Sequence, residues 1–402
     1  MLWHFIHIID ILLWLFMAAS TLYILFFALV STLWKKRVNE LTQFLTGQKL
    51  AMQDKEYSTF LVLYPAYHED RVIVPSVRTF LGQYYPYDGF HVAVISDHMQ
   101  PETNQALSEL PITLLQPVFE KSSKAKAMQY AMDQIKEDYD YVIIMDADNV
   151  VNADFLQRLS ESCAHGYKAI QCHRCAKNKD NDIAVLDGVS EEINNTIFRK
   201  AHNRIGLSSA LIGSGMCFDF KWFKENVYKL STAGEDRELE ALLLKDRIFI
   251  KYEPDIHVFD EKVSNKDNFQ KQRLRWMTAQ IQSLFNLLPY IPKAIITLNI
   301  DFIDKTIQQA LIPRSMLVVG TLGLSIVITI FSLLFANNWY IKWWCLFLTI
   351  CISLYIATPR QLRSHSVFGK LLSLPKLVWK MVTNILKIER KNTDFIHTSH
   401  DK

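Results

Sequence analysis

Three long apolar segments constrain this chain more than any other feature of its sequence. Residues 6–34 form an apolar run that exceeds the roughly 20 residues needed to cross a bilayer as a helix. Residues 315–336 contain no charged side chain, and residues 339–357 contain a single one, Lys342. We therefore expect three membrane-spanning helices that flank a more polar middle section.

Basic residues at the ends of these segments predict how the chain is oriented. Lys35, Lys36 and Arg37 directly follow the first segment, Arg314 precedes the second, and Arg360 follows the third. Because Lys and Arg stay on the cytoplasmic side, we expect the N-terminus outside the cell and the middle section and C-terminus in the cytoplasm. No Lys or Arg precedes the first segment, so its pattern is not that of a cleavable signal peptide.

The apolar segments divide the chain into five predicted parts. These are an N-terminal anchor (1–37), a cytosolic domain (38–280), an interfacial helical segment (281–312), a transmembrane hairpin (313–358) and a cytosolic amphipathic tail (359–402). The interfacial segment and the tail mix apolar residues with prolines or lysines, which is typical of helices in the headgroup plane. The alternatives are a buried helical hairpin in a soluble core, and an interfacial segment that simply packs on the domain.

Charge and cysteine content exclude some classes of function. The formal net charge is +3 and no basic domain stands out, so we expect no nucleic-acid partner. The six cysteines are scattered. Cys172 and Cys175 form a C-x-x-C pair without a second pair, which supports zinc binding only weakly. Reduced thiols are the simpler interpretation.

The middle section alternates between strand-like and helix-like patterns. Strand-like runs occur at residues 59–64, 90–97, 112–115 and 141–145, and helical spacing occurs at residues 72–84 and 124–136. Such alternation predicts an α/β layer fold with a largely parallel sheet.

Polar side chains follow three of the predicted strands. His68 and Glu69 follow the first strand, Asp97 ends the second, and Asp146 and Asp148 follow the fourth. Ligands of open α/β sheets collect at the carboxyl ends of the strands. We therefore expect these side chains to share one ligand site.

The pair Asp146 and Asp148 indicates a divalent cation. Residues i and i+2 of an extended segment point the same way, and two neighbouring carboxylates both stay ionised only near a positive charge. Oxygen ligands suit Mg²⁺ or Mn²⁺, which proteins usually hold with one or two carboxylates and substrate phosphates. The pair therefore predicts a metal-bound diphosphate.

Two further segments fit a phosphate-containing ligand. Lys124 opens a predicted helix, where a phosphate would also meet backbone N–H groups. Gly213 and Gly215 flank Ser214 in an otherwise apolar stretch, as expected where backbone passes close to a ligand. A solvated basic turn is the alternative interpretation for the lysine.

Two later helices complete the candidate site. Glu235 and Asp236 lie in the first turn of one predicted helix, where the helix dipole alone would also explain them. Gln272, Arg275 and Trp276 lie in the stretch QKQRLRWMTAQ. The arginine could clamp a phosphate and the tryptophan could stack on a sugar ring. The alternative is a helix that only anchors the domain to the membrane.

Taken in order, these segments resemble the membrane-bound inverting enzymes of glycosyltransferase family 2, which include cellulose, hyaluronan and chitin synthases and ceramide glucosyltransferase. The resemblance covers about residues 58–280. It rests on PAYHE at 65–69, KAKAMQYA from Lys124, D-A-D at 146–148, GEDRELE around Asp236, Q-x-x-R-W at 272–276 and the closing FIHTSH at 395–400. It implies a GT-A domain, which is a Rossmann-like fold with a mostly parallel sheet, and a bacterial inner-membrane location.

The resemblance also implies a role for each matched residue. Asp236 would be the catalytic base, and Asp146 and Asp148 would hold Mg²⁺ or Mn²⁺. The donor-binding residues would be Pro65, Glu69, Asp97, Lys124, Asp146 and Arg275. The acceptor-binding residues would be Gly213, Ser214, Gly215, Glu235, Gln272 and Trp276. The implied reaction moves a sugar from a nucleotide-diphosphate donor, expected to be a UDP-sugar, to a lipid-linked, glycolipid or polysaccharide acceptor, with further membrane subunits as candidate partners.

The chain departs from the family pattern in ways that keep alternatives open. His68 stands where Asn is usual, Ser123 replaces Gly, and three spans are fewer than polymer-extruding synthases carry. D-A-D-N-V also fits the motif of a metal-dependent phosphatase, although that aspartate normally follows a first strand and here follows a fourth. The other alternative, a non-catalytic membrane subunit, would be expected to have lost Asp148, Asp236 or Arg275.

Overall fold

The computed structural model describes residues 2–34, 55–178, 181–262, 266–335 and 337–363. Its central element is an eight-stranded sheet with the strand order β3-β2-β1-β4-β7-β6-β8-β5. The strands are β1 (Phe60–Tyr67), β2 (Phe90–Asp97), β3 (Thr113–Leu115), β4 (Tyr141–Ile144), β5 (Val150–Val151), β6 (Ala169–Ala176), β7 (Met216–Asp219) and β8 (Ile250–Asp260).

The sheet is parallel at one side and mixed at the other. β1 pairs in parallel with β2 and β4, and β2 pairs in parallel with β3. β7 runs antiparallel between β4 and β6, β8 is parallel to β6, and β5 is antiparallel to β8. The predicted α/β fold is confirmed, and its parallel part brings the ends of β1, β2 and β4 to one edge.

Strand β1 is longer than the sequence pattern predicts. Pro65 was expected to end the strand, but pairing with β2 continues as far as Tyr67 and Asp97. On the other side of β1 the pairing with β4 ends at Leu63 and Ile144. A proline is tolerated where a strand is paired on only one side, so Pro65 lies at the start of the exposed strand end.

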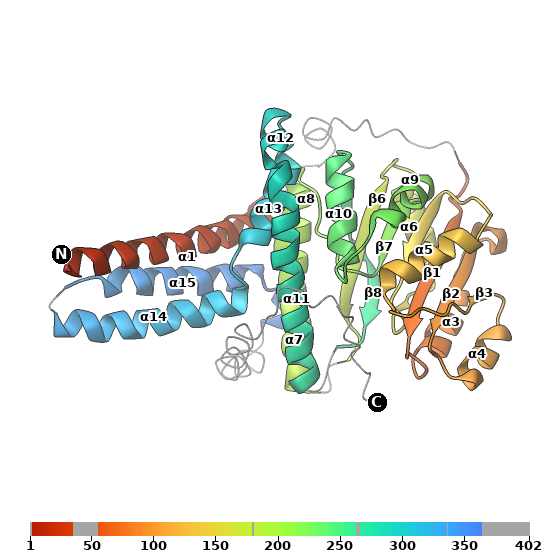
Figure 1. Ribbon diagram of the computed structural model, residues 1–402, viewed down its shortest axis with the longest axis horizontal. Coiled ribbons are helices and arrows are strands. Elements are labelled where there is room, and N and C mark those ends of the chain that lie inside the picture. Colours follow the sequence, from red (N-terminus) through yellow and green to blue (C-terminus); the bar gives the residue numbers. More distant parts are fainter. Residues whose placement is uncertain (1, 35–54, 179–180, 263–265, 336, 364–402) are drawn as a thin grey trace.

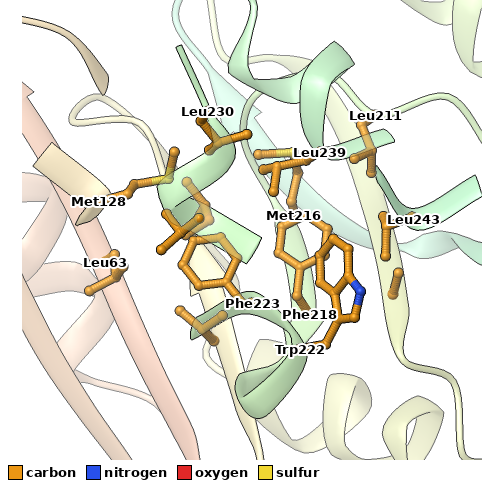
Figure 2. Close-up of a cluster of buried hydrophobic side chains, with 14 of the residues drawn as sticks. Leu63, Met128, Leu211, Met216, Phe218, Trp222, Phe223, Leu230, Leu239 and Leu243 are labelled. Carbon is orange, nitrogen blue, oxygen red and sulfur yellow. The ribbon is translucent and has the colours of Figure 1, made fainter. Parts of the chain in front are cut away.

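Alternate residues of the strands pack into two apolar clusters on opposite faces of the sheet. Leu61 and Leu63 belong to one cluster, and Phe60 and Val62 belong to the other. Figure 2 shows the first cluster, in which Leu63 lies among side chains of α5, β7, α9 and α10. This packing fixes the starts of α5 and α10 relative to the strand ends.

Helices cover both faces of the sheet and connect it to a separate helical bundle (Figure 1). The helices around the sheet are α3 (Ile73–Leu81), α4 (Pro101–Ser108), α5 (Lys124–Gln134), α6 (Phe155–Cys163), α9 (Phe220–Asn226) and α10 (Glu235–Lys245). Those between the sheet and the bundle are α7 (Asp182–Asn194), the π-helix η2 (Asn195–Ala201), α8 (His202–Arg204), α11 (Lys266–Leu287), α12 (Ile291–Ile296) and α13 (Ile300–Ala310).

Three helices form the bundle, and they lie at the positions of the three predicted spans. They are α1 (Leu2–Leu33), α14 (Arg314–Leu334) and α15 (Tyr340–Ala357), and each is long and apolar enough to cross a membrane. α15 packs against both α1 and α14, and the three lie side by side in Figure 1, with α7 and α11 standing between them and the sheet. The predicted amphipathic tail and FIHTSH lie outside the described residues.

Candidate functional site

One cavity of about 610 Å³ lies at the carboxyl ends of β1, β2 and β4. Twelve of the fourteen predicted site residues line it, namely Pro65, Glu69, Asp97, Lys124, Asp146, Asp148, Gly213, Glu235, Asp236, Gln272, Arg275 and Trp276. The two others, Ser214 and Gly215, are buried directly behind it. The structure therefore brings together residues that are as far apart in the chain as Pro65 and Trp276.

Asp146 and Asp148 occupy different environments at the end of β4. The Asp146 carboxylate pairs with Lys124 and lies 3.8 Å from the Arg174 guanidinium. Burial opposes its ionisation, but these two cations outweigh burial and lower the pKa of Asp146. Asp148 is 4% exposed and accepts hydrogen bonds from the Glu261 N–H (2.7 Å) and the Asn149 amide (3.2 Å). Burial and nearby carboxylates raise its pKa well above the usual range.

Lys124 connects three segments of the site. It is the first residue of α5, whose N-cap Ser123 accepts a hydrogen bond from the Lys126 N–H (3.2 Å). Its ammonium pairs with Asp146, donates to the Gly213 carbonyl (2.7 Å) and lies 3.7 Å from Glu235. Burial disfavours the ammonium, but Asp146 and Glu235 outweigh it and raise the pKa of Lys124. The lysine therefore stays charged at the strand ends.

The structure requires glycine at positions 213 and 215 for different reasons. Both have positive φ, +83° at Gly213 and +61° at Gly215. A Cβ on Gly215 would lie 2.8 Å from Val258 Cγ2, whereas one on Gly213 would meet only Glu235 Oε1, at 4.0 Å. Gly215 is thus required by packing against β8, and only Gly213 borders the cavity. Ser214 is fully buried between them.

The first turn of α10 places two carboxylates at the cavity wall. Glu235 is 8% exposed, and burial raises its pKa to about 7 although Lys124 acts in the opposite direction. Asp236 is half-buried, lines the cavity and accepts a hydrogen bond from the Arg237 N–H (2.8 Å). The two neighbours therefore differ, since Glu235 is buried beside Lys124 and Asp236 faces the open volume.

Helix α11 lines the cavity between the strand ends and the bundle. Gln272, Arg275 and Trp276 all line the cavity. The buried Oε1 of Gln272 has no hydrogen-bond partner among the described residues. The Arg273 guanidinium pairs with Asp187 and lies 4.7 Å from the centre of the Trp276 ring. Helix α11 thus presents a polar side chain, two cations and one aromatic ring to the cavity.

Histidines flank Asp97, one of the predicted donor-binding residues, at the ends of β1 and β2. Asp97 is 3% exposed, and its carboxylate lies 2.5 Å from His98 Nδ1. His68 and His98 both have positive φ, +55° and +57°, a conformation that costs free energy for residues other than glycine and that recurs at functional sites. Their rings are 5.6 Å apart, and both contact Tyr67.

Arg174 of β6 is a site residue that sequence reasoning missed. Its guanidinium lies 3.3 Å from Glu191, 3.7 Å from Asp260 and 3.8 Å from Asp146. Glu191 also pairs with Arg199 (3.0 Å). Burial opposes the ionisation of Glu191, but the Arg174 and Arg199 guanidinium groups hold its pKa well below the usual range. No motif marks Arg174, because only the pairing of β6 with β8 brings it beside the strand ends.

The carboxylates at the strand ends fit a divalent cation that is completed by a ligand. Burial and the charges of Asp148 and Asp146 raise the pKa of Glu69 to about 8, so negative charge is in excess there and a cation would relieve it. Within the described part of the chain, no three His, Cys, Asp or Glu side chains converge as a metal site. Phosphate oxygens of a bound ligand would therefore have to supply the remaining positions.

The C-x-x-C pair has no comparable surroundings. Cys172 is buried in the core of the sheet, and Cys175 donates weakly to the Val258 carbonyl (3.7 Å). All six cysteines are free thiols. The structure thus fits reduced thiols at these positions.

The solved structures that are distantly similar to this chain include the following three. S. aureus TarS is 15% identical over 57% of this chain and 65% of its own, with a TM-score of 0.40. The mannosyltransferase PcManGT from Pyrobaculum calidifontis, in complex with GDP-Man and Mn²⁺, is 13% identical over 85% and 98%, with a TM-score of 0.46. Glucosyl-3-phosphoglycerate synthase from Mycobacterium tuberculosis is 12% identical over 56% and 78%, with a TM-score of 0.42. This chain thus spans less than two thirds of the TarS structure.

Comparison with sequences and family models gives the assignment. No curated protein sequence matches the chain. The model of glycosyltransferase like family 2 matches residues 58–279, a range that runs from the start of β1 into α11 and covers more than half of the chain. It includes every side chain at the strand ends, together with the mixed α/β sheet that the GT-A fold requires. This protein therefore belongs to glycosyltransferase like family 2.

Proposed function

We propose that this protein is a membrane-bound inverting glycosyltransferase that moves a sugar from a nucleotide-diphosphate donor, a UDP-sugar, to a lipid-linked, glycolipid or polysaccharide acceptor. One observation carries the proposal. The same cavity is lined by the carboxylates and lysine of the strand ends, by Asp236, and by side chains of all three bundle helices. A nucleotide-sugar site that opens toward membrane helices suits an acceptor that comes from the membrane.

The proposed reaction is a single displacement at the anomeric carbon. Asp236 takes the proton of an acceptor hydroxyl while that oxygen forms a bond to the anomeric carbon. The bond from this carbon to the diphosphate oxygen breaks, and the nucleoside diphosphate leaves with the electron pair. Attack from the opposite face inverts the configuration, so an α-linked donor gives a β-glycoside. General-base help of this kind typically contributes about 10²–10⁴ in rate.

Charge at the strand ends supports the departure of the diphosphate. Lys124 is held at this position by Asp146 and the Gly213 carbonyl, and Arg275 faces the cavity from α11. Preorganised cations of this kind often contribute the largest part of catalysis. Asp146 and Asp148 would hold Mg²⁺ or Mn²⁺, which when bound neutralises charge on the leaving diphosphate.

The acceptor side of the site is assigned to the remaining residues. Gly213, Glu235, Gln272 and Trp276 line the cavity around Asp236, with Ser214 and Gly215 behind the first of them. We further propose that the N-terminus lies outside the cell and that the α/β domain and C-terminus lie in the cytoplasm of a bacterium. The five predicted parts of the chain stand as the proposed domain division.

The decisive test is turnover by the purified full-length chain in nanodiscs, with a panel of UDP-sugars and with phosphoesters as the comparison. We expect released UDP and a new glycoside. We expect no phosphoester hydrolysis, because the chain belongs to a glycosyltransferase family and not to a phosphatase family. Asp236→Asn should lower turnover by about 10²–10⁴ while UDP binding is retained. Asp138→Asn, at an exposed position, is the matched control. Full turnover by the Asp236 variant would refute the assignment of the base, and no turnover by the parent protein would favour a non-catalytic subunit.

A further inference from the structure

The cavity continues from the strand ends into the helical bundle. Six aliphatic side chains line this part, and they come from the bundle helices and from the neighbouring α7: Ile24 of α1, Val189 and Ile193 of α7, Val318 and Val319 of α14, and Leu354 of α15. We call these six residues the aliphatic arm. None of their side chains can form a hydrogen bond, so the arm is a different chemical environment from the strand ends.

The depth of the arm limits what it could hold. Val319 is five residues from the first residue of α14 and Leu354 is three residues from the last residue of α15, or about 8 and 5 Å at 1.5 Å per residue. Ser20 of α1 is level with the start of α14, because its hydroxyl accepts a hydrogen bond from the Ile312 N–H (3.3 Å). The arm therefore reaches only into the leaflet on the side of the α/β domain.

Close helix packing lies just beyond the arm. A Cβ on Gly320 of α14 would be 3.1 Å from Met17 Cε of α1, so these two helices meet tightly at that level. A conduit for a growing polysaccharide would have to continue past this contact and would need partners for sugar hydroxyls. A hydrocarbon chain needs no passage beyond this contact and no hydrogen-bond partners. Each methylene that it buries strengthens binding by about fourfold.

Arg314 stands between the arm and the strand ends. It is the first residue of α14, lines the cavity and donates to the carbonyl (3.0 Å) and hydroxyl (3.1 Å) of Ser190. Among the described residues no carboxylate lies within 4 Å of its guanidinium. Arg273, which also lines the cavity, is in contrast paired with Asp187. A guanidinium without an acidic partner at the neck of an apolar pocket fits an anionic group, and phosphate matches its geometry best.

We propose that the acceptor is a membrane lipid whose phosphate binds Arg314 and whose hydrocarbon chain occupies the aliphatic arm. The proposal rests on the proposed function, because it places the lipid headgroup between Arg314 and Asp236. There a headgroup hydroxyl, or the protonated oxygen of a terminal phosphate, loses its proton to Asp236 and attacks the sugar donor. It narrows the lipid acceptors named above to a lipid that carries a phosphate, and it excludes a polysaccharide.

The test measures lipid binding separately from turnover, by native mass spectrometry of the full chain carrying Asp236→Asn in detergent. The probes are phosphatidylglycerol, diacylglycerol with the same chains, glycerol phosphate, and polyprenyl phosphate. We expect either lipid phosphate to bind at least about tenfold more tightly than diacylglycerol, and glycerol phosphate not to bind. Equal binding of diacylglycerol, or binding of glycerol phosphate alone, would overturn the proposal. Incubating the parent protein with a sugar donor and each lipid that binds then shows which of the lipid phosphates is glycosylated.

Two pairs of variants locate the lipid. Val319→Trp fills the arm and should weaken binding by about tenfold or more, whereas Val327→Trp on the same helix, at a 59% exposed position outside the cavity, should not. Arg314→Gln should weaken binding by about tenfold and Arg314→Lys should restore most of it, with the exposed Arg158→Gln as control. Unchanged lipid binding in both Val319→Trp and Arg314→Gln would overturn the proposal. Binding of Mn²⁺ and UDP reports on the donor site independently of the lipid. If the protein binds lipid normally but does not bind Mn²⁺ and UDP, the result counts against the proposed function and not against the lipid site.

Discussion

Replacing Arg174 by methionine should destabilise the protein far more than loss of an ordinary surface arginine. The guanidinium lies within 4 Å of Asp146, Glu191 and Asp260, and its side chain is 9% exposed. Methionine has a similar length and no charge, so the variant keeps most of the packing and removes only the cation. Three carboxylates then lose a shared partner, and two of them, Glu191 and Asp260, are largely buried.

The magnitude follows from the burial of this network. Removing one partner of a buried ion pair costs about 3–5 kcal/mol, because the remaining charge is left uncompensated. Each carboxylate keeps at least one other cation, because Lys262 lies 2.7 Å from Asp260 and 3.7 Å from Glu191, Arg199 lies 3.0 Å from Glu191, and Lys124 pairs with Asp146. The cost should therefore lie near the lower limit. About 3 kcal/mol corresponds to a fall in Tm of about 6–12 °C for a domain of 150–250 residues.

Thermal unfolding in detergent, followed by near-UV circular dichroism, checks this value. Arg158→Met is the matched control, because Arg158 and Asp154 form an exposed pair at 4.0 Å, and pairs of that kind contribute at most about 1 kcal/mol. Mn²⁺ should recover part of the loss in Arg174→Met if the freed carboxylates accept a cation. Equal melting temperatures for the Arg174 and Arg158 variants would refute the view that Arg174 organises the strand ends.

Three other predictions concern the same site. The pKa of Glu235 is raised to about 7 from 4.5, so ionisation of this side chain opposes folding. The free energy of unfolding should therefore fall by up to about 3 kcal/mol as the pH rises from 4.5 through 7. In chemical denaturation, Glu235→Gln should flatten this part of the pH profile. Gly215→Ala should destabilise the protein by about 1–3 kcal/mol more than Gly213→Ala, because only the former brings a Cβ against Val258, which thermal unfolding checks. Chelation with EDTA should abolish sugar transfer and Mn²⁺ should restore it. In a titration, Asp148→Asn should raise the Mn²⁺ concentration that restores half of the transfer.

Much of the fold could be predicted because its signals are local. The spans and strands are continuous apolar runs, and β2, β3 and β4 begin and end within one residue of the predicted bounds. Pro65 shows where a local rule fails. A proline normally ends a strand, but this one lies where β4 has already ended, and only the order of strands in the sheet reveals that.

The candidate site divides in the same way. Asp146, Lys124 and Asp236 could be predicted because each follows a strand or opens a helix at the cavity, and motifs record such positions. Arg174 could not, because its role depends on which strand pairs with β6. Gly215 was predicted to let backbone approach a ligand, and the structure shows that its small size serves packing against Val258. The aliphatic arm is also invisible in sequence, because its residues come from four helices.

Direct side-chain contacts join the bundle to the helices beside the α/β sheet. The Tyr23 hydroxyl of α1 donates to Asp304 of α13 (2.7 Å) and lies 2.9 Å from His202 Nε2. The ring of Phe27, one turn further along α1, stacks on His202 with centroids 3.7 Å apart. These contacts hold α1 against α8 and α13, and α13 leads through Ile312 directly into α14. If Asp236 is the base, as proposed above, these contacts favour an acceptor that reaches it along the bundle, because the cavity that Asp236 lines continues between the bundle helices.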